Sequence, residues 1–398
     1  MSEPRILRGR VVTESEVISD GAVVFDEVIR KCGVVSQVLT ENEAARAERV
    51  DGYILPGLVD VHCHGGGGES FPNAQTEEQA MVAVMEHRRH GTTSLVASGV
   101  TAAADVLRSR AVTLANLCEK DELAGIHFEG PFVSVERKGA QDPTYIIEPD
   151  VELTKELIEL SKGYCVTMTL APEKKGAFGE GSVAEALIEG GALPSWGHTD
   201  AGPESVRKAL EYSREKLAQV APRSPKATAT HLFNGMRPIH HRDPGPVPEF
   251  ISDAARDGAI LELIGDGVHL SADIVRAVYE TLGREYLVLV TDAMAAAGMP
   301  DGSYQLGPQA VTVKDGIARL TGGDSIAGGT SHLLDQVRLL YQGGYVPLVD
   351  AVYMASVQGA KIIGDQTIGC LREGMKADVV VVSDSLEPVT VYRRGVAV

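Results

Sequence analysis

The sequence is poor in cysteine, with five among 398 residues. Their number is odd and no two form a Cys-x-x-Cys pair, so neither a disulfide framework nor a cysteine-based zinc knuckle is indicated. The five are Cys32, Cys63, Cys118, Cys165 and Cys370. Scattered single cysteines are typical of reduced thiols, and we expect a cytoplasmic protein.

Long apolar runs and positive charge are also missing. No stretch approaches the roughly 20 apolar residues that cross a bilayer, and residues 1–18 lack the apolar core of a signal peptide. Lysine and arginine number 37 against 55 aspartate and glutamate, a formal net charge of −18. Such an acidic chain repels nucleic acid and anionic membranes, so neither is an expected partner, and an anionic substrate would need a local basic pocket.

The overall composition is that of a globular enzyme. Hydrophobic residues make up 44% and charged residues 23%, which excludes disordered and collagen-like chains. At roughly 150 residues per domain, the length predicts two to three domains or one large barrel with an appendage.

Short β-rich runs alternate with helical patterns between residues 58 and 292, as expected of parallel βα units. Eight runs are predicted strands: Leu58–His64, Thr93–Ser98, Gly125–Glu129, Cys165–Pro172, Pro194–His198, Ala227–Phe233, Ile260–Asp266 and Tyr286–Asp292. Eight units in about 235 residues fit a (β/α)₈ barrel, for which roughly 250 residues are typical.

Both ends of the chain are rich in short β-patterns and most simply pair with each other, because isolated strand pairs are barely stable in water. We therefore predict an α/β protein with a TIM-type barrel catalytic domain at residues 55–364 and a small β-sandwich domain formed by residues 1–54 and 365–398.

Thr76 and Gln79 predict the start of a helix within the barrel domain, and Gly91 is the glycine expected just after the end of that helix.

Further elements are expected after the eighth strand. A hairpin is predicted at Gly302–Leu320 with its turn at Asp315-Gly316. Helical patterns follow near Ser331–Gln342 and Pro347–Ile363.

Barrel active sites form at the carboxyl ends of the strands, so polar residues at those ends are the candidate functional residues. The candidates are His62 and His64 on the first strand, Glu129 on the third, His198 on the fifth, His231 on the sixth and Asp292 on the eighth. All are residue types that ligate metal ions. One alone would carry little weight, but their recurrence at five strand ends predicts a metal centre.

The spacing supports this interpretation. His62 and His64 are two apart on a strand, so their side chains share a face about 6.6 Å apart along it. An inward carboxylate such as Glu129 is costly to bury alone, and bridging metal ions would satisfy it. His127 lies two residues before Glu129, so its side chain is expected on the same inward face of the strand. It is either a metal ligand or a hydrogen-bond partner of a ligand, and the two interpretations have equal weight.

Asp292 follows an entirely apolar strand and is the candidate acid/base, because hydrophobic walls and a metal would tune its pKa. His269 follows the seventh strand and is placed to face the site. Residues 237–242 form a basic loop, which is either a solvated surface loop or a binding site for an anion such as phosphate.

These residues together resemble the amidohydrolase superfamily. The resemblance begins with residues 56–65, which read PGLVDVHCHG. Segments 127–132 (HFEGPF), 197–200 (GHTD), 231–236 (HLFNGM), 266–270 (DGVHL) and 290–293 (VTDA) are similar to the deacetylases of N-acetylglucosamine 6-phosphate. The similarity covers nearly the whole chain, and its motifs are specific in combination.

The resemblance implies an enzyme that hydrolyses the N-acetyl amide of N-acetylglucosamine 6-phosphate, giving acetate and glucosamine 6-phosphate. It implies a metal ion held by Glu129, His198 and His231, with Asp292 as the catalytic acid/base. The pair His62 and His64 makes a second ion plausible, since relatives that lack the pair work with one.

Substrate contacts are implied as well. The resemblance places the phosphate near Asn234, Gly235 and Arg242 and a sugar contact at His269. The arginine can come from the neighbouring subunit, so a homodimer is expected. Further expected substrate contacts are Ala140, Gln141, Ile326, Ala327 and Gly328.

Two features depart from the family pattern. Gln141 stands where many relatives have a histidine that touches the sugar. Residues 65–68 are four consecutive glycines, a loop that we expect to move with substrate.

Alternatives and the metal's identity stay open in the sequence. A cyclic amidohydrolase such as a dihydroorotase or hydantoinase shares the histidine pair and the strand-eight aspartate, although no lysine ends the fourth strand to bridge its metals. A non-catalytic sugar-phosphate-binding relative is the alternative from another class, and a phosphotriesterase-like hydrolase is a third. Zinc is the expected ion, but His/carboxylate sites also accept iron, cobalt and manganese.

Overall fold

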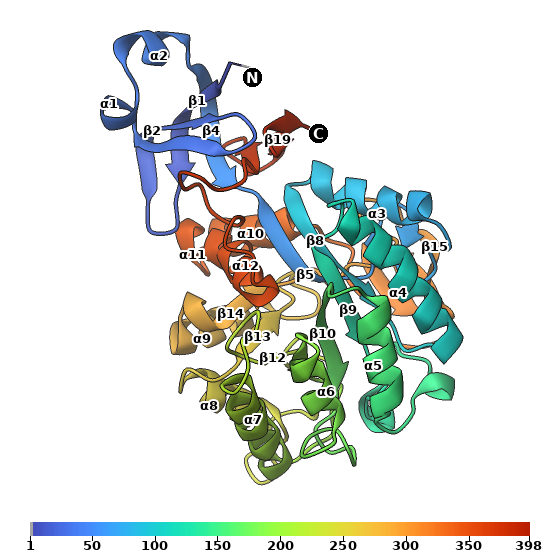
Figure 1. The fold of residues 1–398 in the computed structure, drawn as a ribbon. Helices are drawn as coiled ribbons and strands as arrows, with labels where there is room; N and C mark the ends of the chain where they lie inside the picture. Colours follow the sequence, from blue (N-terminus) through green and yellow to red (C-terminus); the bar gives the residue numbers. More distant parts are fainter. Residues whose placement is uncertain (1–2) are drawn as a thin grey trace.

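The computed structural model describes residues 3–398 and contains a barrel with a smaller β-rich part to one side (Figure 1). The barrel sheet has eight parallel strands in the order β14-β13-β12-β11-β10-β9-β8-β5. They are β5 (Leu58–Cys63), β8 (Thr92–Gly99), β9 (Gly125–Glu129), β10 (Cys165–Leu170), β11 (Leu193–Trp196), β12 (Thr228–Ala229), β13 (Ile260–Leu263) and β14 (Leu287–Leu289). The eight predicted strands and the barrel class are confirmed.

The seam between β5 and β14 is closed partly by a side chain. The backbone N–H of Asp292 donates to the carbonyl of His62 at 2.8 Å. Thr291 donates through its backbone N–H (3.3 Å) and its hydroxyl (2.6 Å) to the buried carboxylate of Asp60. A carboxylate therefore replaces ladder hydrogen bonds where the first and last strands meet.

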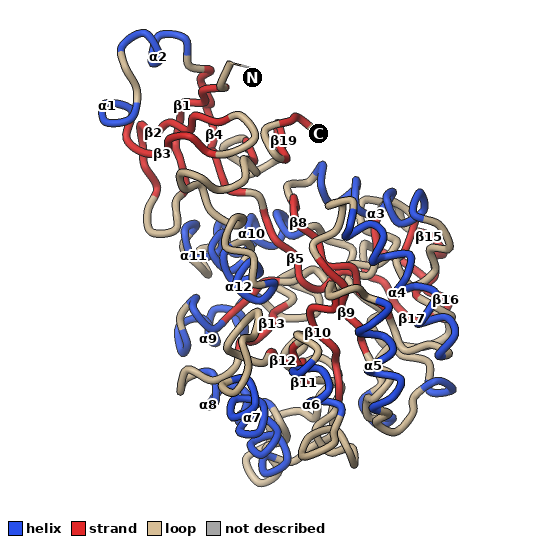
Figure 2. The backbone as a smooth tube through the Cα atoms, in the orientation of Figure 1, coloured by secondary structure: helices blue, strands red, loops and turns tan. Residues whose placement is uncertain are grey.

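Helices cover the outside of the barrel strands (Figure 2). They are α3 (Glu77–Arg89), α4 (Ala104–Glu119), α5 (Val151–Leu160), α6 (Val183–Glu189), α7 (Pro203–Leu217), α8 (Val247–Ala254), α9 (Ala272–Leu282), α10 (Leu333–Gln342), α11 (Leu348–Met354) and α12 (Val357–Ile363). Thr76 caps α3 as predicted, accepting the N–H of Gln79. None of the helices within residues 3–398 has both the length and the apolar character needed to cross a bilayer.

The helix predicted at Pro347–Ile363 is interrupted, forming α11 and α12. The carbonyl of Ala355 accepts the backbone N–H of Val59 at 2.9 Å, so it leaves the helical ladder. This contact with the first barrel strand, which local sequence does not encode, explains the break.

The β-rich part is one seven-stranded sheet in the order β20-β19-β18-β4-β1-β2-β3. Its strands are β1 (Arg5–Val12), β2 (Val17–Phe25), β3 (Ile29–Val34), β4 (Glu48–Pro56), β18 (Val379–Val382), β19 (Pro388–Arg393) and β20 (Val396–Ala397). Because β18 pairs with β4, the expected union of the two chain ends is confirmed. The domain limits at residues 54/55 and 364/365 stay a prediction.

Smaller elements flank the barrel mouth. The predicted hairpin forms a three-stranded meander of β15 (Gly302–Leu306), β16 (Gln309–Lys314) and β17 (Ile317–Leu320). Its Asp315-Gly316 turn has positive φ at both residues, as a tight hairpin turn requires. Short elements complete the chain: α1 (Val35–Val38), α2 (Glu41–Arg46), β6 (Gly65–Gly66), β7 (Glu69–Ser70) and three 3₁₀ turns at Val135–Arg137, Pro143–Tyr145 and Arg284–Tyr286.

Candidate active site

A pocket of about 380 Å³ opens at the carboxyl ends of the barrel strands. Most of the predicted site residues line it: His64, Glu129, Ala140, Gln141, His198, His231, Asn234, Gly235, His269, Asp292, Ile326 and Gly328. His62 lies fully buried next to His64, and Ala327 is buried behind the wall. Arg242 is exposed and is not part of the lining.

Two groups of three potential metal ligands meet at Glu129. In one, Oε1 of Glu129 lies 3.1 Å from Nε2 of His198 and 2.9 Å from Nε2 of His231. In the other, Oε2 of Glu129 lies 3.3 Å from Nε2 of His64, whose Nε2 is 3.2 Å from that of His62. Donor atoms around one tetrahedral zinc ion lie about 3.3 Å apart, so both groups have suitable spacing.

The opposite ring nitrogens of three of these histidines are already occupied. Nδ1 of His62 lies 2.9 Å from the Glu262 carboxylate, that of His64 lies 3.2 Å from the Ser98 carbonyl and that of His198 lies 2.7 Å from the Arg137 carbonyl. Because these partners are acceptors, each Nδ1 carries the proton and each Nε2 presents a lone pair. Lone pairs that face one another across about 3 Å require a cation between them, so this donor set fits a divalent metal ion.

Electrostatics agree with this arrangement. Burial alone would raise the pKa of Glu129, but the charge and hydrogen bond of His198, with the hydrogen bonds of His231 and His64, hold it well below its usual range. Burial opposes protonation of His64, yet its hydrogen bonds to Asp292 and Glu129 raise its pKa to about 10. The site thus draws positive charge strongly, which a bound ion would satisfy in place of protons.

Asp292 lies on the open side of these groups. Its Oδ1 is 3.1 Å from Nε2 of His64 and 3.5 Å from Nε2 of His62, and its side chain is the most exposed of the cluster at 12%. Burial would raise its pKa, but the hydrogen bond from His64 and the charges of His62 and His64 lower it to about 2. Asp292 is therefore a carboxylate that can accept a proton from a group in the pocket.

The backbone at three site residues is strained. His198, His231 and Asp292 have φ values of 46°, 27° and 47°, which side-chain-bearing residues rarely adopt. Gly235 approaches His198 so closely that an added Cβ would lie 2.7 Å from Nδ1 of the ring. Tight loops at the strand ends therefore aim these side chains into the pocket.

His127 lies beside the metal-ligand groups without joining them. Its Nδ1 is 2.9 Å from the Ser98 hydroxyl and its Nε2 is 2.9 Å from the Thr169 hydroxyl. The ring packs edge-on against His62 with centroids 4.4 Å apart. Of the two interpretations of His127, the geometry favours a hydrogen-bonded support under His62.

The glycine run at residues 65–68 is held along its length. The N–H groups of Gly65, Gly67 and Gly68 donate to carbonyls of residues 293, 297 and 295 at 2.8–2.9 Å. This loop joins the end of β5 to the chain after Asp292, so it fixes the first strand against the eighth. Movement of the run with substrate stays a prediction.

Two residues support the ligands: Glu262, which the sequence analysis did not identify, and Gln141, which it assigned to the substrate. Glu262, on β13, holds Nδ1 of His62 and also accepts the backbone N–H of His231 at 3.2 Å. The sequence did contain a signal for Glu262, because it is the one charged residue of the buried strand Ile260–Leu263. Gln141 donates its amide N–H to Oε2 of Glu129 and accepts the backbone N–H of Thr101 at 2.8 Å, so it orients the shared carboxylate.

Replacing Glu262 by glutamine is expected to weaken metal binding about 10–100-fold at the His62 side, because the amide is a poorer acceptor for the Nδ1 proton. Metal content after dialysis against graded chelator measures this. Glu249→Gln, at a partly buried glutamate on α8, serves as the control. Unchanged chelator resistance would show that Glu262 does not support the ligand.

Two of the three predicted phosphate contacts lie in the pocket, and the third does not. Asn234 and Gly235 line the pocket, and His269 does so with its Nδ1 held 2.8 Å from the Asp266 carboxylate. Arg242 instead contacts His241 on the exposed loop. Within the described chain, no lysine or arginine lines the pocket.

Comparisons with known proteins identify the family of this chain. The sequence profile of the Amidohydrolase family matches residues 53–398. An N-acetylglucosamine-6-phosphate deacetylase of Lysinibacillus sphaericus is 33% identical over 90% of this chain and 90% of its own. An N-acetylgalactosamine-6-phosphate deacetylase of Escherichia coli O157:H7 is 29% identical over 98% of each.

A solved structure is similar over the whole chain. It is a mutant N-acetyl-D-glucosamine-6-phosphate deacetylase from Mycobacterium smegmatis in complex with N-acetyl-D-glucosamine-6-phosphate. The identity is 34%, the TM-score is 0.89, and the match covers 100% of this chain and 99% of that one.

Proposed function

Because this chain belongs to the amidohydrolase family, we propose that it is a metal-dependent deacetylase of N-acetylglucosamine 6-phosphate that releases acetate and glucosamine 6-phosphate. The observation that carries the proposal is the pair of three-ligand groups sharing Glu129, with the Asp292 carboxylate facing the same pocket. Relatives named for this activity align with nearly the entire chain.

We propose that one or two zinc ions are the cofactor. Glu129, His198 and His231 would hold the first, and His62, His64 and Glu129 the second. Nitrogen and carboxylate donors in groups of three, with a position open toward the pocket, suit catalytic zinc. Metal analysis of the purified protein distinguishes zinc from iron, cobalt and manganese.

Hydrolysis of an amide needs an activated water, a polarised carbonyl and a protonated leaving nitrogen. A divalent ion supplies a water of lowered pKa and acts as a Lewis acid. Asp292 accepts the proton of the attacking water and then delivers it to the departing nitrogen, as general base and then general acid. Its Oδ1 lies 3.1 Å from Nε2 of His64, beside the donor atoms that would hold the ion.

We propose that the phosphate is bound across the interface of a homodimer. Among the described residues, no lysine or arginine lines the pocket, whereas Arg242 stands on an exposed loop from which it would reach a partner's pocket. Arginine binds phosphate through paired N–H groups. A phosphorylated substrate and free thiols at all five cysteines support action in the cytoplasm.

Replacing Arg242 by alanine is expected to raise KM for the sugar phosphate about tenfold or more with little change in kcat, because a hydrogen bond between charged groups contributes about 1.5–3 kcal/mol. Arg256→Ala, on another exposed arginine, is the control. Mixing Arg242→Ala chains with Asp292→Asn chains would restore low-KM activity if the arginine acts across the interface. An unchanged KM in Arg242→Ala would mean that the loop faces elsewhere.

The direct test is acetate release by the purified protein, with and without chelator. The substrates are N-acetylglucosamine 6-phosphate, its galacto epimer, unphosphorylated N-acetylglucosamine and dihydroorotate. The galacto epimer is included because relatives named for that substrate align with 98% and 97% of this chain. Fast, chelator-sensitive activity on the first substrate supports the proposal, and a metal-replete protein inactive on all four contradicts it.

The other interpretations fit the site less well. A cyclic amidohydrolase bridges its metals with a lysine after the fourth strand, but β10 ends at Leu170, and Glu129 from β9 is the residue that the two ligand groups share. A binding protein without catalysis does not need Asp292 beside a complete ligand set.

A further inference from the structure

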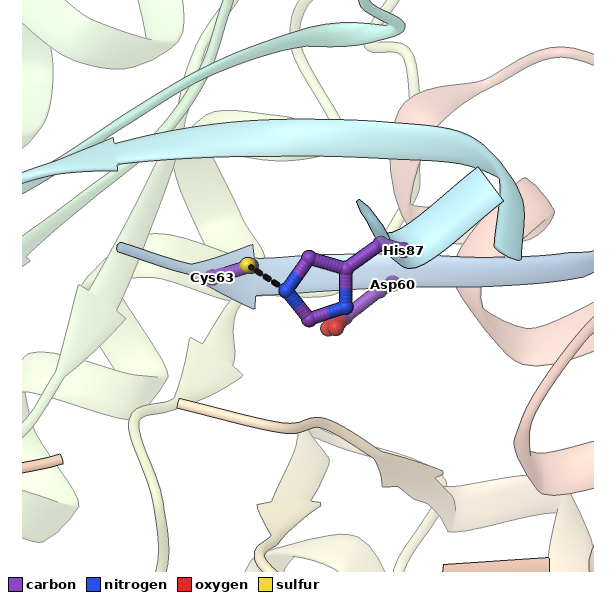
Figure 3. A group of neighbouring side chains, drawn as sticks. All are labelled: Asp60, Cys63 and His87. Carbon is purple, nitrogen blue, oxygen red and sulfur yellow. Dashed lines mark hydrogen bonds between the residues drawn. The ribbon is translucent and has the colours of Figure 1, made fainter. Parts of the chain in front are cut away.

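A separate group of ligand-type side chains lies at the seam of the barrel. Asp60, Cys63 and His87 each offer one donor atom, and these atoms lie within 4.8 Å of one another. Figure 3 shows the His87 ring of α3 beside the Cys63 sulfur and the Asp60 carboxylate of β5. All three residues are fully buried, and none belongs to the two groups around Glu129.

Hydrogen bonding leaves one buried atom of this group, on the His87 ring, without a partner. Nε2 of His87 lies 2.8 Å from the Gly65 carbonyl and 3.3 Å from Sγ of Cys63, while its buried Nδ1 has no partner. With the proton on Nε2, the ring donates to Gly65, and the buried Nδ1 lone pair has no partner. With the proton on Nδ1, the Nε2 lone pair faces the carbonyl oxygen. Burial lowers the pKa of His87 to about 3, so the doubly protonated ring does not resolve the conflict.

Charge is also unbalanced. The Asp60 carboxylate accepts hydrogen bonds from the N–H of His62 (3.2 Å) and from the N–H and hydroxyl of Thr291, all neutral donors. Among the ion pairs of residues 3–398, none includes Asp60. A buried carboxylate without a cation is costly. One divalent ion with one carboxylate and one thiolate would be neutral overall.

We propose that Asp60, Cys63 and His87 form an additional metal site for a single zinc-like ion. Thiolate, imidazole and carboxylate are all donors that zinc takes in proteins, and cobalt binds the same donors. The Cys63 thiol proton is released to solvent as the sulfur–metal bond forms. The Gly65 carbonyl oxygen lies 3.6 Å from Sγ of Cys63 and 2.8 Å from Nε2 of His87, so it would serve as a fourth donor.

The position gives such an ion a structural consequence. Cys63 stands between His62 and His64, Asp60 bonds across the seam to Thr291, and His87 belongs to the covering helix. An ion bound here would join the first strand, the seam and α3. It would brace the strand that carries two of the proposed catalytic ligands.

Cobalt binding tests the proposal without any measurement of deacetylation. The two groups around Glu129 contain only nitrogen and oxygen donors, so a thiolate-to-cobalt charge-transfer band reports the Cys63 site alone. The full-length protein is stripped of metal with chelator, dialysed and titrated with Co²⁺. We expect a near-ultraviolet band that saturates at the intensity of one thiolate–cobalt bond per chain, is absent in Cys63→Ser and persists in Cys165→Ser. Cys165 is a buried cysteine outside every donor group found in residues 3–398.

Three outcomes would overturn the site. They are no charge-transfer band in the wild-type protein at excess cobalt, a band that survives Cys63→Ser, and a band lost in Cys165→Ser. If Cys63→Ser fails to fold, His87→Gln replaces it, with an expected loss of cobalt affinity of at least tenfold, and unchanged affinity contradicts the proposal. The test is independent of the proposed deacetylase activity, because the cobalt band can be measured whether or not the protein is active.

Discussion

Asp292→Asn is expected to lower kcat for deacetylation about 10²–10⁴-fold, the range that a positioned general acid/base contributes. Asparagine has the same shape but cannot take up the proton of the attacking water. The two metal-ligand groups comprise five residues, with Glu129 shared, and Asp292 is not one of them, so metal content should be unchanged. Steady-state kinetics and metal analysis on the same preparation measure both quantities.

The control for Asp292→Asn is Asp273→Asn, an exposed aspartate on α9 paired with Arg276. It should leave both kcat and metal content at wild-type values. Wild-type turnover in Asp292→Asn would remove Asp292 from the chemistry. Loss of metal in that variant would instead make Asp292 a ligand, as its 3.1 Å approach to Nε2 of His64 allows for a shared ion.

Glu129→Gln is expected to abolish both metal binding and activity. Each three-ligand group loses one member, because Glu129 is the residue they share. A glutamine would also place an amide N–H or a neutral oxygen against the Nε2 atoms of His198 and His231, which lie 3.1 and 2.9 Å from the present carboxylate oxygen. Metal-ion catalysis supplies several kcal/mol, so kcat should fall about 10³-fold or more.

Metal content and thermal stability should change together in Glu129→Gln, because an ion that binds only the folded state stabilises it. Glu136→Gln, an exposed glutamate just downstream, is the control and should keep its metal. Full metal content in Glu129→Gln would show that the carboxylate does not ligate. Full content with lost turnover would restrict Glu129 to catalysis.

Local sequence identified much of this site for a simple geometric reason. Parallel barrel strands bring their carboxyl ends to one face, so residues far apart in the chain converge once the strands are recognised. His62, His64, Glu129, His198, His231 and Asp292 gather in this way. The same logic did not find Glu262, which lies one residue before the end of its strand and acts through His62, 200 residues away.

Other features depended on contacts that no short segment encodes. The break between α11 and α12 follows from Val59 taking the Ala355 carbonyl. The exposed position of Arg242 follows from the path of a loop after β12. Gln141 was expected as a sugar contact at a position where relatives carry histidine, yet its amide holds Glu129 and its carbonyl holds the backbone of Thr101.

The sequence alone determined the class of fold, the union of the chain ends and the residue types that meet at the barrel mouth. Repeating hydrophobic patterns and strand-end residues carry that information, because they reflect short-range periodicity. Tertiary structure decided which nitrogen of each histidine is free, which carboxylates support the ligands and how the seam is closed. It also placed Cys63 against His87. These depend on distances between residues from different strands and helices, and only packing of the whole chain sets such distances.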